Sequence, residues 1–219
     1  MTGGPGPRVY AVRRIADFGE DHAGAAPWAD LPPLLVDRYL WLNNGYEPRV
    51  EARLGWSPRF VYVRFEVAEK RAAVRYLKFQ DPVYKDSCVE FFVDMFPGKR
   101  LGYLNFEMNA VGTLLAQFGP DRNDRKPLWP EDLAGFSVLA ADELEKEGGA
   151  PAWSVAYRIP LALFKKFYGE DIRPGHRARA NFYKCGDDTP IRHYGAWSPV
   201  GTPSPDFHRP EYFGELVFE

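Results

Sequence analysis

Two neighbouring stretches of the chain, residues 87–95 and 103–110, alternate between apolar and polar side chains. A period of two is typical of β-strands, whose successive side chains point to opposite faces of a sheet. The connecting residues 96–102 (FPGKRLG) are rich in turn formers. The pattern therefore predicts a β-hairpin, with an apolar face made of Val89, Phe91, Val93, Leu104, Phe106, Met108 and Ala110.

The opposite face of this predicted hairpin is polar. Its second strand carries Asn105, Glu107 and Asn109. If the turn centres near Lys99, Glu90 on the first strand lies opposite Glu107, within the reach of a cross-strand pair. The sequence thus predicts a cluster of carboxylates and amides on one sheet face. The alternative is an ordinary solvated face, because outward faces of antiparallel sheets are usually polar.

The rest of the chain continues the same pattern of short strands separated by Gly- and Pro-containing turns. Such a pattern predicts an all-β antiparallel sandwich or barrel. One short helix is expected over 160–168, with Pro160 near its first turn and Gly169 at its end. The further strands are expected at 8–15, 48–54, 60–67, 74–79, 114–118, 136–141, 153–159, 177–184 and 215–218.

Three segments outside these strands bear on domain organisation and function. Residues 1–7 are rich in Gly and Pro and are expected to be a mobile terminus, which leaves 8–219 as a single domain. The charged loop 119–130 is interpreted as solvated surface, with the border of a binding site as the alternative. The long segment 187–211 contains five prolines, and long ordered loops in compact domains are often functional.

Composition excludes several classes of function. The formal net charge is −2, which gives no electrostatic reason to expect nucleic acid or an anionic membrane as a partner. No apolar run is long enough to span a bilayer, and the N-terminus lacks the apolar segment of a secretory signal. The chain as written is therefore expected to be cytoplasmic, or extracellular or periplasmic if a signal peptide has been removed. Cys88 and Cys185 are expected to be free thiols, although one disulfide is the alternative.

Known catalytic and cofactor motifs are missing from the sequence. There is no phosphate-binding glycine loop, no G-x-S-x-G and no H-E-x-x-H. The four histidines stand far apart, which argues against a zinc site built on them. Met95 and Met108 form no convincing axial pair with a histidine, which argues against haem. No cofactor is therefore expected.

The paired carboxylates Glu90 and Glu107 leave two interpretations open. A glycoside hydrolase needs two carboxyl groups roughly 5 to 10 Å apart, one of them protonated. Lys85 or Lys184 nearby would instead keep both groups ionised. Ionised carboxylates accept hydrogen bonds from sugar hydroxyls, so the interpretation favours binding over hydrolysis. A protein-interaction module, in which exposed aromatic residues anchor a partner, is the remaining alternative.

Several short runs of residues also resemble one known family. They are Tyr84 to Val93 (YKDSCVEFFV), Asn105 to Asn109 with Gly112-Thr113, Asn181 to Asp187 (NFYKCGD), Trp197-Ser198-Pro199 and Phe207 to Leu216. In this order they resemble the family 9 carbohydrate-binding modules, particularly the stand-alone family 9-like type. The resemblance implies a jelly-roll-like β-sandwich that binds an oligosaccharide or polysaccharide without cleaving it. It also allows structural calcium and an association with glycoside hydrolases.

The resemblance further implies how a sugar is held. Tyr84 and Trp197 fall on two aromatic rings that sandwich a sugar, although a core position is the competing interpretation of Trp197. Glu90 and Asn181 fall on side chains that bond its hydroxyls. The sequence departs from the family at Glu107, where other members can carry Arg, and at Tyr183, which replaces a smaller residue. The candidate binding residues are thus Tyr84, Glu90, Asn105, Glu107, Asn181, Tyr183 and Trp197.

Overall fold

The computed structural model describes residues 8–18, 27–69, 71–143 and 152–219. The predicted mobile terminus at 1–7 lies outside the described residues, and the single domain stays a prediction. The predicted hairpin is present, formed by β6 (Cys88–Asp94) and β7 (Tyr103–Asn109). Its register places Glu90 opposite Glu107 and Phe91 opposite Phe106. A short 3₁₀ turn, Pro97–Lys99, joins the two strands.

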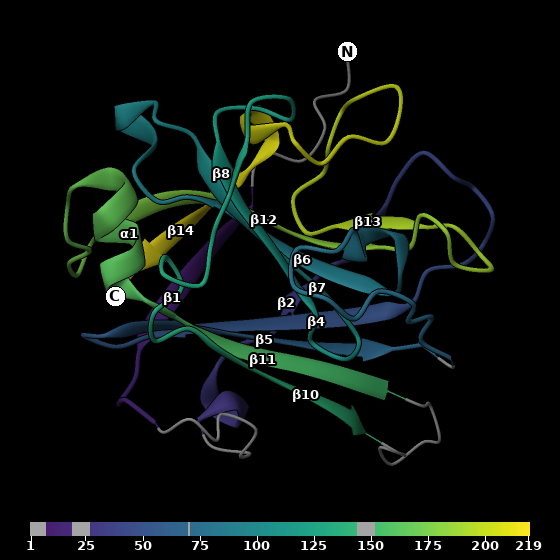
Figure 1. Cartoon of the computed structure of the whole chain (residues 1–219), viewed down its shortest axis with the longest axis horizontal. Helices are drawn as coiled ribbons and strands as arrows, with labels where there is room; N and C mark the ends of the chain where they lie inside the picture. Colours follow the sequence, from purple (N-terminus) through teal and green to yellow (C-terminus); the bar gives the residue numbers. More distant parts are fainter. Residues whose placement is uncertain (1–7, 19–26, 70, 144–151) are drawn as a thin grey trace.

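Most of the described strands form one hydrogen-bonded path that folds over on itself into two packed layers (Figure 1). One layer contains the hairpin together with β8 (Leu114–Gly119), β9 (Lys126–Pro127), β12 (Arg177–Cys185), β13 (Tyr194–Ala196), β14 (Gly214–Phe218) and β3 (Arg38–Tyr39). The other contains β2 (Leu34–Leu35), β4 (Arg49–Trp56), β5 (Phe60–Ala68), β10 (Ser137–Glu143) and β11 (Ala152–Pro160). The predicted all-β sandwich is confirmed.

The first strand, β1 (Val9–Arg14), joins the two layers. Val9 to Val12 pair in parallel with Glu215 to Phe218 of β14, and the end of β1 pairs in parallel with β4. The sheet is therefore mixed, whereas the sequence predicted antiparallel strands throughout. Alternation along a terminal strand gives the direction of its side chains but not the direction of its neighbour.

The prediction of a strand at 74–79 is wrong. Its backbone N–H groups are bound by side chains instead of a neighbouring strand. The carboxylate of Asp86 accepts hydrogen bonds from the N–H groups of Arg75 and Tyr76, at 2.9 and 3.0 Å. The carboxylate of Asp81 accepts those of Leu77 and Lys78. Side-chain acceptors satisfy the backbone donors here and make a strand partner unnecessary.

The short helix α1 (Leu161–Tyr168) is present as predicted, and it ends at Gly169 with a φ of +76°. Its buried side chains are Leu163, Phe164 and Tyr168. In the part of the chain that the structure describes, no helix has both the length and the apolar character needed to cross a membrane.

The main core lies between the two layers. Phe182 of β12 stacks on Phe91 of β6 with ring centroids 4.8 Å apart, and it meets Phe65 of the other layer at 6.0 Å. Trp197, which follows β13, packs edge-on against Phe182 and is 4% exposed. Gly214 lies directly against the ring of Trp197. Packing in the core therefore fixes the position of the layer that contains β6 and β7.

Gly214→Ala should destabilise the fold strongly. A Cβ at this position would lie within 2.7 Å of both the Trp197 ring and the carbonyl oxygen of Arg8. Overpacking of this kind costs about 1–3 kcal/mol, measurable by denaturant unfolding. Gly98→Ala is the matched control, because a Cβ there meets no atom within 4 Å. Equal stability of the two variants would contradict the packing described for Gly214.

Candidate functional site

The polar side chains on one face of the β6–β7 hairpin are buried. Register places Glu90 between Glu107 on β7 and Tyr183 on β12. Glu90 and Glu107 are only 3% and 4% exposed, and Asn105 is fully buried. The acids and amides share one face as predicted, but the alternative of a solvated face is wrong. Residues from the segments 80–84, 122–125 and 205–208, together with Asp187 and Tyr194, lie over this face.

These loops enclose a cavity of about 400 Å³ above the two acids. Glu90, Glu107 and Cys185 from the strands line it. The surrounding loops contribute Tyr84, Arg122, Arg125, Asp187, Tyr194, Asp206, Phe207 and His208. The cavity therefore combines carboxylates, guanidinium groups and aromatic rings within one enclosure.

Glu107 is held by a chain of hydrogen bonds that starts at Arg125. The Arg125 guanidinium donates to the Asn105 side-chain oxygen, with Nε at 3.1 Å, and lies over the Tyr103 ring. The Asn105 amide in turn donates to Glu107 Oε1 at 2.8 Å. The second oxygen of Glu107, Oε2, is buried and has no hydrogen-bond partner among the described residues. One acceptor on a cavity-lining side chain is thus left open.

The lysines expected to keep both acids ionised lie elsewhere. Lys85 pairs with Asp188 at 3.6 Å. Lys184 is fully buried, and its ammonium group lies 2.7 Å from His193 Nε2 and 3.4 Å from the Glu69 carboxylate. The expectation of two ionised carboxylates is wrong, because the side chain of Lys184 is bound to other partners.

Burial therefore governs the protonation of the two acids. It raises the pKa of Glu90 well above its usual value, and the neighbouring Cys185 and Glu107 act in the same direction. Burial also raises the pKa of Glu107 to about 7, against the hydrogen bond from Asn105 and the charge of Arg125. Both side chains hold a proton at a pH where an exposed glutamate would be ionised.

Tyr84 joins the two acids in lining the cavity, and this residue is 37% exposed. Asn105 lies below the cavity lining and acts through Glu107. Two other predicted residues hold the covering loops. The Asn181 amide donates to the Ser198 carbonyl and its oxygen accepts the Ser198 N–H, both at 2.8 Å. Tyr183 stacks on Phe207 at 4.0 Å and donates its hydroxyl to the Phe207 carbonyl.

Trp197 is not brought to the cavity. Its backbone N–H donates to the Phe182 carbonyl, and its ring lies in the core between the layers. This is the core position that the sequence offered as the competing interpretation. Tyr84 therefore lines the cavity without the partner ring that the resemblance implied.

Sequence reasoning missed the residues that the loops contribute, including Arg122, Arg125, Asp187, Tyr194 and His208. The sequence favours solvated surface for the charged loop and gives the border of a binding site as the alternative; Arg122 and Arg125 of this loop line the cavity, and Arg125 reaches Asn105. His208 Nδ1 lies 2.8 Å from the Tyr103 hydroxyl. Burial and the two nearby arginines lower the pKa of His208 to about 3, so it is neutral. Two features of the sequence could have pointed to these cavity-lining residues: the mixed charges of 119–130 and the length of 187–211.

The sequence profile of carbohydrate-binding family 9 matches residues 28–218. The chain belongs to this family. The match begins beyond β1, the strand that joins the two layers of this family 9 chain. A search of curated proteins finds no match.

Solved structures of similar fold agree with this assignment. A Bacteroides uniformis protein, whose name provisionally assigns it to carbohydrate binding, is 27% identical with a TM-score of 0.82, over 98% of this chain and 100% of its own. A family 9 module of Caldicellulosiruptor kristjanssonii, solved with glucose, is 15% identical with a TM-score of 0.66, over 97% and 96% of the chains. The same organism's module with cellotriose gives 14% and 0.63, over 97% and 94%.

Glu107→Gln should flatten the dependence of stability on pH. An acid whose pKa is raised by folding stabilises the fold fully below its unfolded pKa, here 4.5, and loses that contribution as the pH rises through about 7. One unit of pKa difference corresponds to about 1.4 kcal/mol. For the native chain, the contribution of Glu107 to the free energy of unfolding should therefore fall by a few kcal/mol between pH 5 and pH 8. The Glu107→Gln variant should lack this fall.

Urea unfolding at several pH values measures this slope. The groups that act on Glu107 from neighbouring elements are Asn105, Arg125, Asp187, Arg122 and Glu90. All remain in Glu107→Gln, so the difference between the two slopes reports the proton on Glu107 together with the effect of its charge on Glu90. Identical slopes for the native chain and the variant would contradict a proton held at this position.

Proposed function

We propose that this family 9 chain binds an oligosaccharide in the cavity above Glu90 and Glu107, without cleaving it. The observation that carries the proposal is the open Oε2 of Glu107, a buried oxygen on a cavity-lining side chain. A buried polar atom without a partner costs about 1–3 kcal/mol. A sugar hydroxyl bound there would relieve this cost, and relatives with the same fold have been solved with glucose and cellotriose.

The cavity walls offer the two kinds of surface that a pyranose needs. Sugar rings have apolar C–H faces and a polar rim. Tyr84 and Tyr194 supply aromatic surface, and Asp187 lies next to both. Its backbone N–H donates to the Tyr84 carbonyl at 3.2 Å. Arg122 lines the cavity nearby and can bond the rim. These contacts replace the predicted sandwich of Tyr84 and Trp197.

Hydrolysis by Glu90 and Glu107 is the second candidate, because an acid that keeps its proton is what a glycoside hydrolase requires. The arrangement of the pair argues for binding. The two residues are direct cross-strand neighbours on one face, whereas a hydrolase places its acids on either side of the scissile bond. We therefore expect no turnover of bound oligosaccharides.

A glycan screen followed by calorimetry tests the proposal. A cello- or xylo-oligosaccharide panel should include at least one ligand. At pH 8, Glu107→Gln should weaken its binding by about tenfold or more, since a hydrogen bond to a charged group contributes about 1.5–3 kcal/mol. Lys85→Gln is the matched control, as its charge faces Asp188 outside the cavity.

Three results would count against this account. Release of products during the titration, lost in Glu90→Gln, would establish hydrolysis. Absence of binding to any glycan would favour a protein-interaction module. An unchanged affinity in Glu107→Gln would place the sugar away from the open oxygen.

Tyr84→Ala and Trp197→Ala should have opposite effects. Removing the cavity-lining ring of Tyr84 should weaken glycan binding by about tenfold, the effect of about 1.4 kcal/mol, with little change in melting temperature. Removing the core ring of Trp197 should cost about 3–5 kcal/mol of stability and leave the affinity of the folded fraction unchanged. Calorimetry and thermal unfolding of both variants measure the two quantities. Loss of affinity in a stable Trp197→Ala would restore the predicted sandwich.

A further inference from the structure

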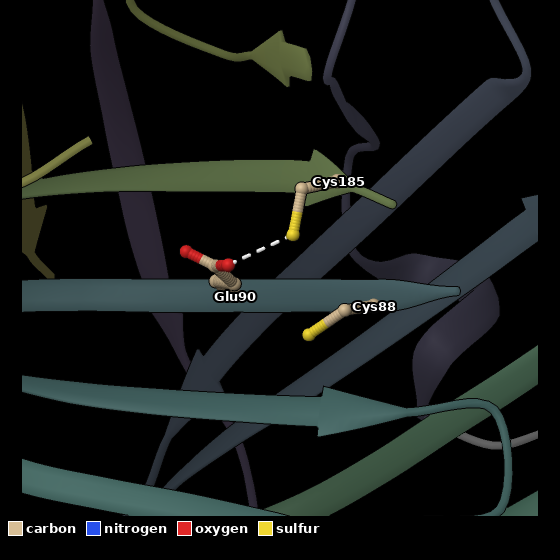
Figure 2. Close-up of side chains that lie close together, drawn as sticks. All are labelled: Cys88, Glu90 and Cys185. Atoms are coloured by element: carbon tan, nitrogen blue, oxygen red, sulfur yellow. Dashed lines mark hydrogen bonds between the residues drawn. The ribbon is translucent and has the colours of Figure 1, made fainter. Parts of the chain in front are cut away.

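The two cysteines of the chain face each other beside Glu90. Cys88 on β6 is the direct partner of Cys185 on β12. Glu90 lies two residues along β6 from Cys88, so its side chain is on the same face. Figure 2 shows the three side chains gathered at the ends of these neighbouring strands, with the carboxylate turned toward Cys185. Register alone therefore brings two thiols and a carboxylate together.

The donor atoms of this group are already close enough to share an ion. The two sulfur atoms and a Glu90 oxygen all lie within 4.8 Å of one another. The Cys185 thiol donates to Glu90 Oε1 at 3.0 Å. Tetrahedral zinc, with Zn–S of about 2.3 Å and Zn–O of about 2.1 Å, needs ligand atoms about 3.6–3.8 Å apart. Small side-chain rotations would reach this spacing without moving the strands.

Apolar packing explains the cysteines but not the carboxylate. Cys88, Glu90 and Cys185 are 0%, 3% and 1% exposed. No ion pair among the described residues involves Glu90, and the neighbouring Lys184 ammonium bonds His193, Glu69 and the Cys185 carbonyl. Among the described residues, the hydrogen bond printed for the Glu90 carboxyl group is the one it accepts from the Cys185 thiol, and buried polar groups are usually bonded more fully. A bound cation would give the carboxylate and both sulfur atoms a shared partner.

We propose that Cys88, Glu90 and Cys185 bind a divalent transition-metal ion of the zinc class. Thiolate ligands favour such ions over calcium or magnesium. Binding replaces the two thiol protons, and the carboxyl proton if present, with bonds to the metal, and the protons pass to solvent. Glu90 and Cys185 also line the cavity, so a water or ligand oxygen can reach the ion from that side. The site does not depend on glycan binding.

Cobalt(II) titration tests this site directly. Protein that has been reduced and stripped with a chelator is titrated anaerobically with cobalt chloride, and thiolate-to-cobalt charge-transfer absorption is recorded. The chain has only these two cysteines, so the band reports on them alone. We expect saturation at one ion per chain, displacement by zinc, and release of protons into a weakly buffered solution.

Variants separate the ligands from their surroundings. Cys88→Ser and Cys185→Ser should each lose most of the band and weaken binding by about 100-fold or more, beyond the effect of changing a residue that only hydrogen-bonds a metal ligand. Glu90→Gln should weaken cobalt binding, whereas Glu107→Gln, with the neighbouring carboxylate removed, should keep the band. Circular dichroism checks that each variant is folded.

The cobalt titration of the native chain can by itself contradict the proposed metal site. Absence of a charge-transfer band in reduced native protein would overturn the proposal without any variant. So would metal binding of equal strength in folded Cys88→Ser. If the reduced protein binds no metal and both thiols disappear together in air, the pair forms a disulfide and is not a metal site.

Discussion

The pairing of β6 with β7 on one side and β12 on the other is the constraint on which the candidate site depends. It places Glu90 opposite both Glu107 and Tyr183, and it places Cys88 opposite Cys185. A shift of one residue would turn these groups into the core, where Phe91 now packs. The core between the two layers therefore fixes the position of the acids as firmly as it fixes the fold.

The loops that cover the polar face of β6 and β7 orient its side chains and raise the pKa values of its two acids. Asn181 and Tyr183 fasten the loop that contains Ser198 and Phe207 over the sheet. Arg125 reaches in from the opposite loop and holds Glu107 through Asn105. The side chains are thus oriented before a ligand arrives, which reduces the entropy lost on binding. The same enclosure raises the pKa values of the two acids, because water no longer stabilises their charged forms.

Local pattern was sufficient for most of the sheet and for the central acids. Alternation predicted the hairpin, its register and the shared face of Glu90 and Glu107. It failed where a tertiary contact decides the outcome. The carboxylates of Asp81 and Asp86 replace a strand partner at 75–78, and the parallel pairing of β1 depends on distant strands. Trp197 and Arg125 lie in loops without periodicity, so the sequence offered the core position of Trp197 only as the competing interpretation and gave no signal for the inward reach of Arg125.

A crystal structure of the chain with the tightest-binding glycan from the screen would show whether the sugar occupies the cavity above Glu90 and Glu107. We expect a sugar ring in the cavity, with a hydroxyl within hydrogen-bonding distance of Glu107 Oε2 and the ring against Tyr84. A sugar bound elsewhere would contradict it, as on the open apolar surface around Leu77 and Val138. So would a sugar in the cavity with Glu107 Oε2 still lacking a partner.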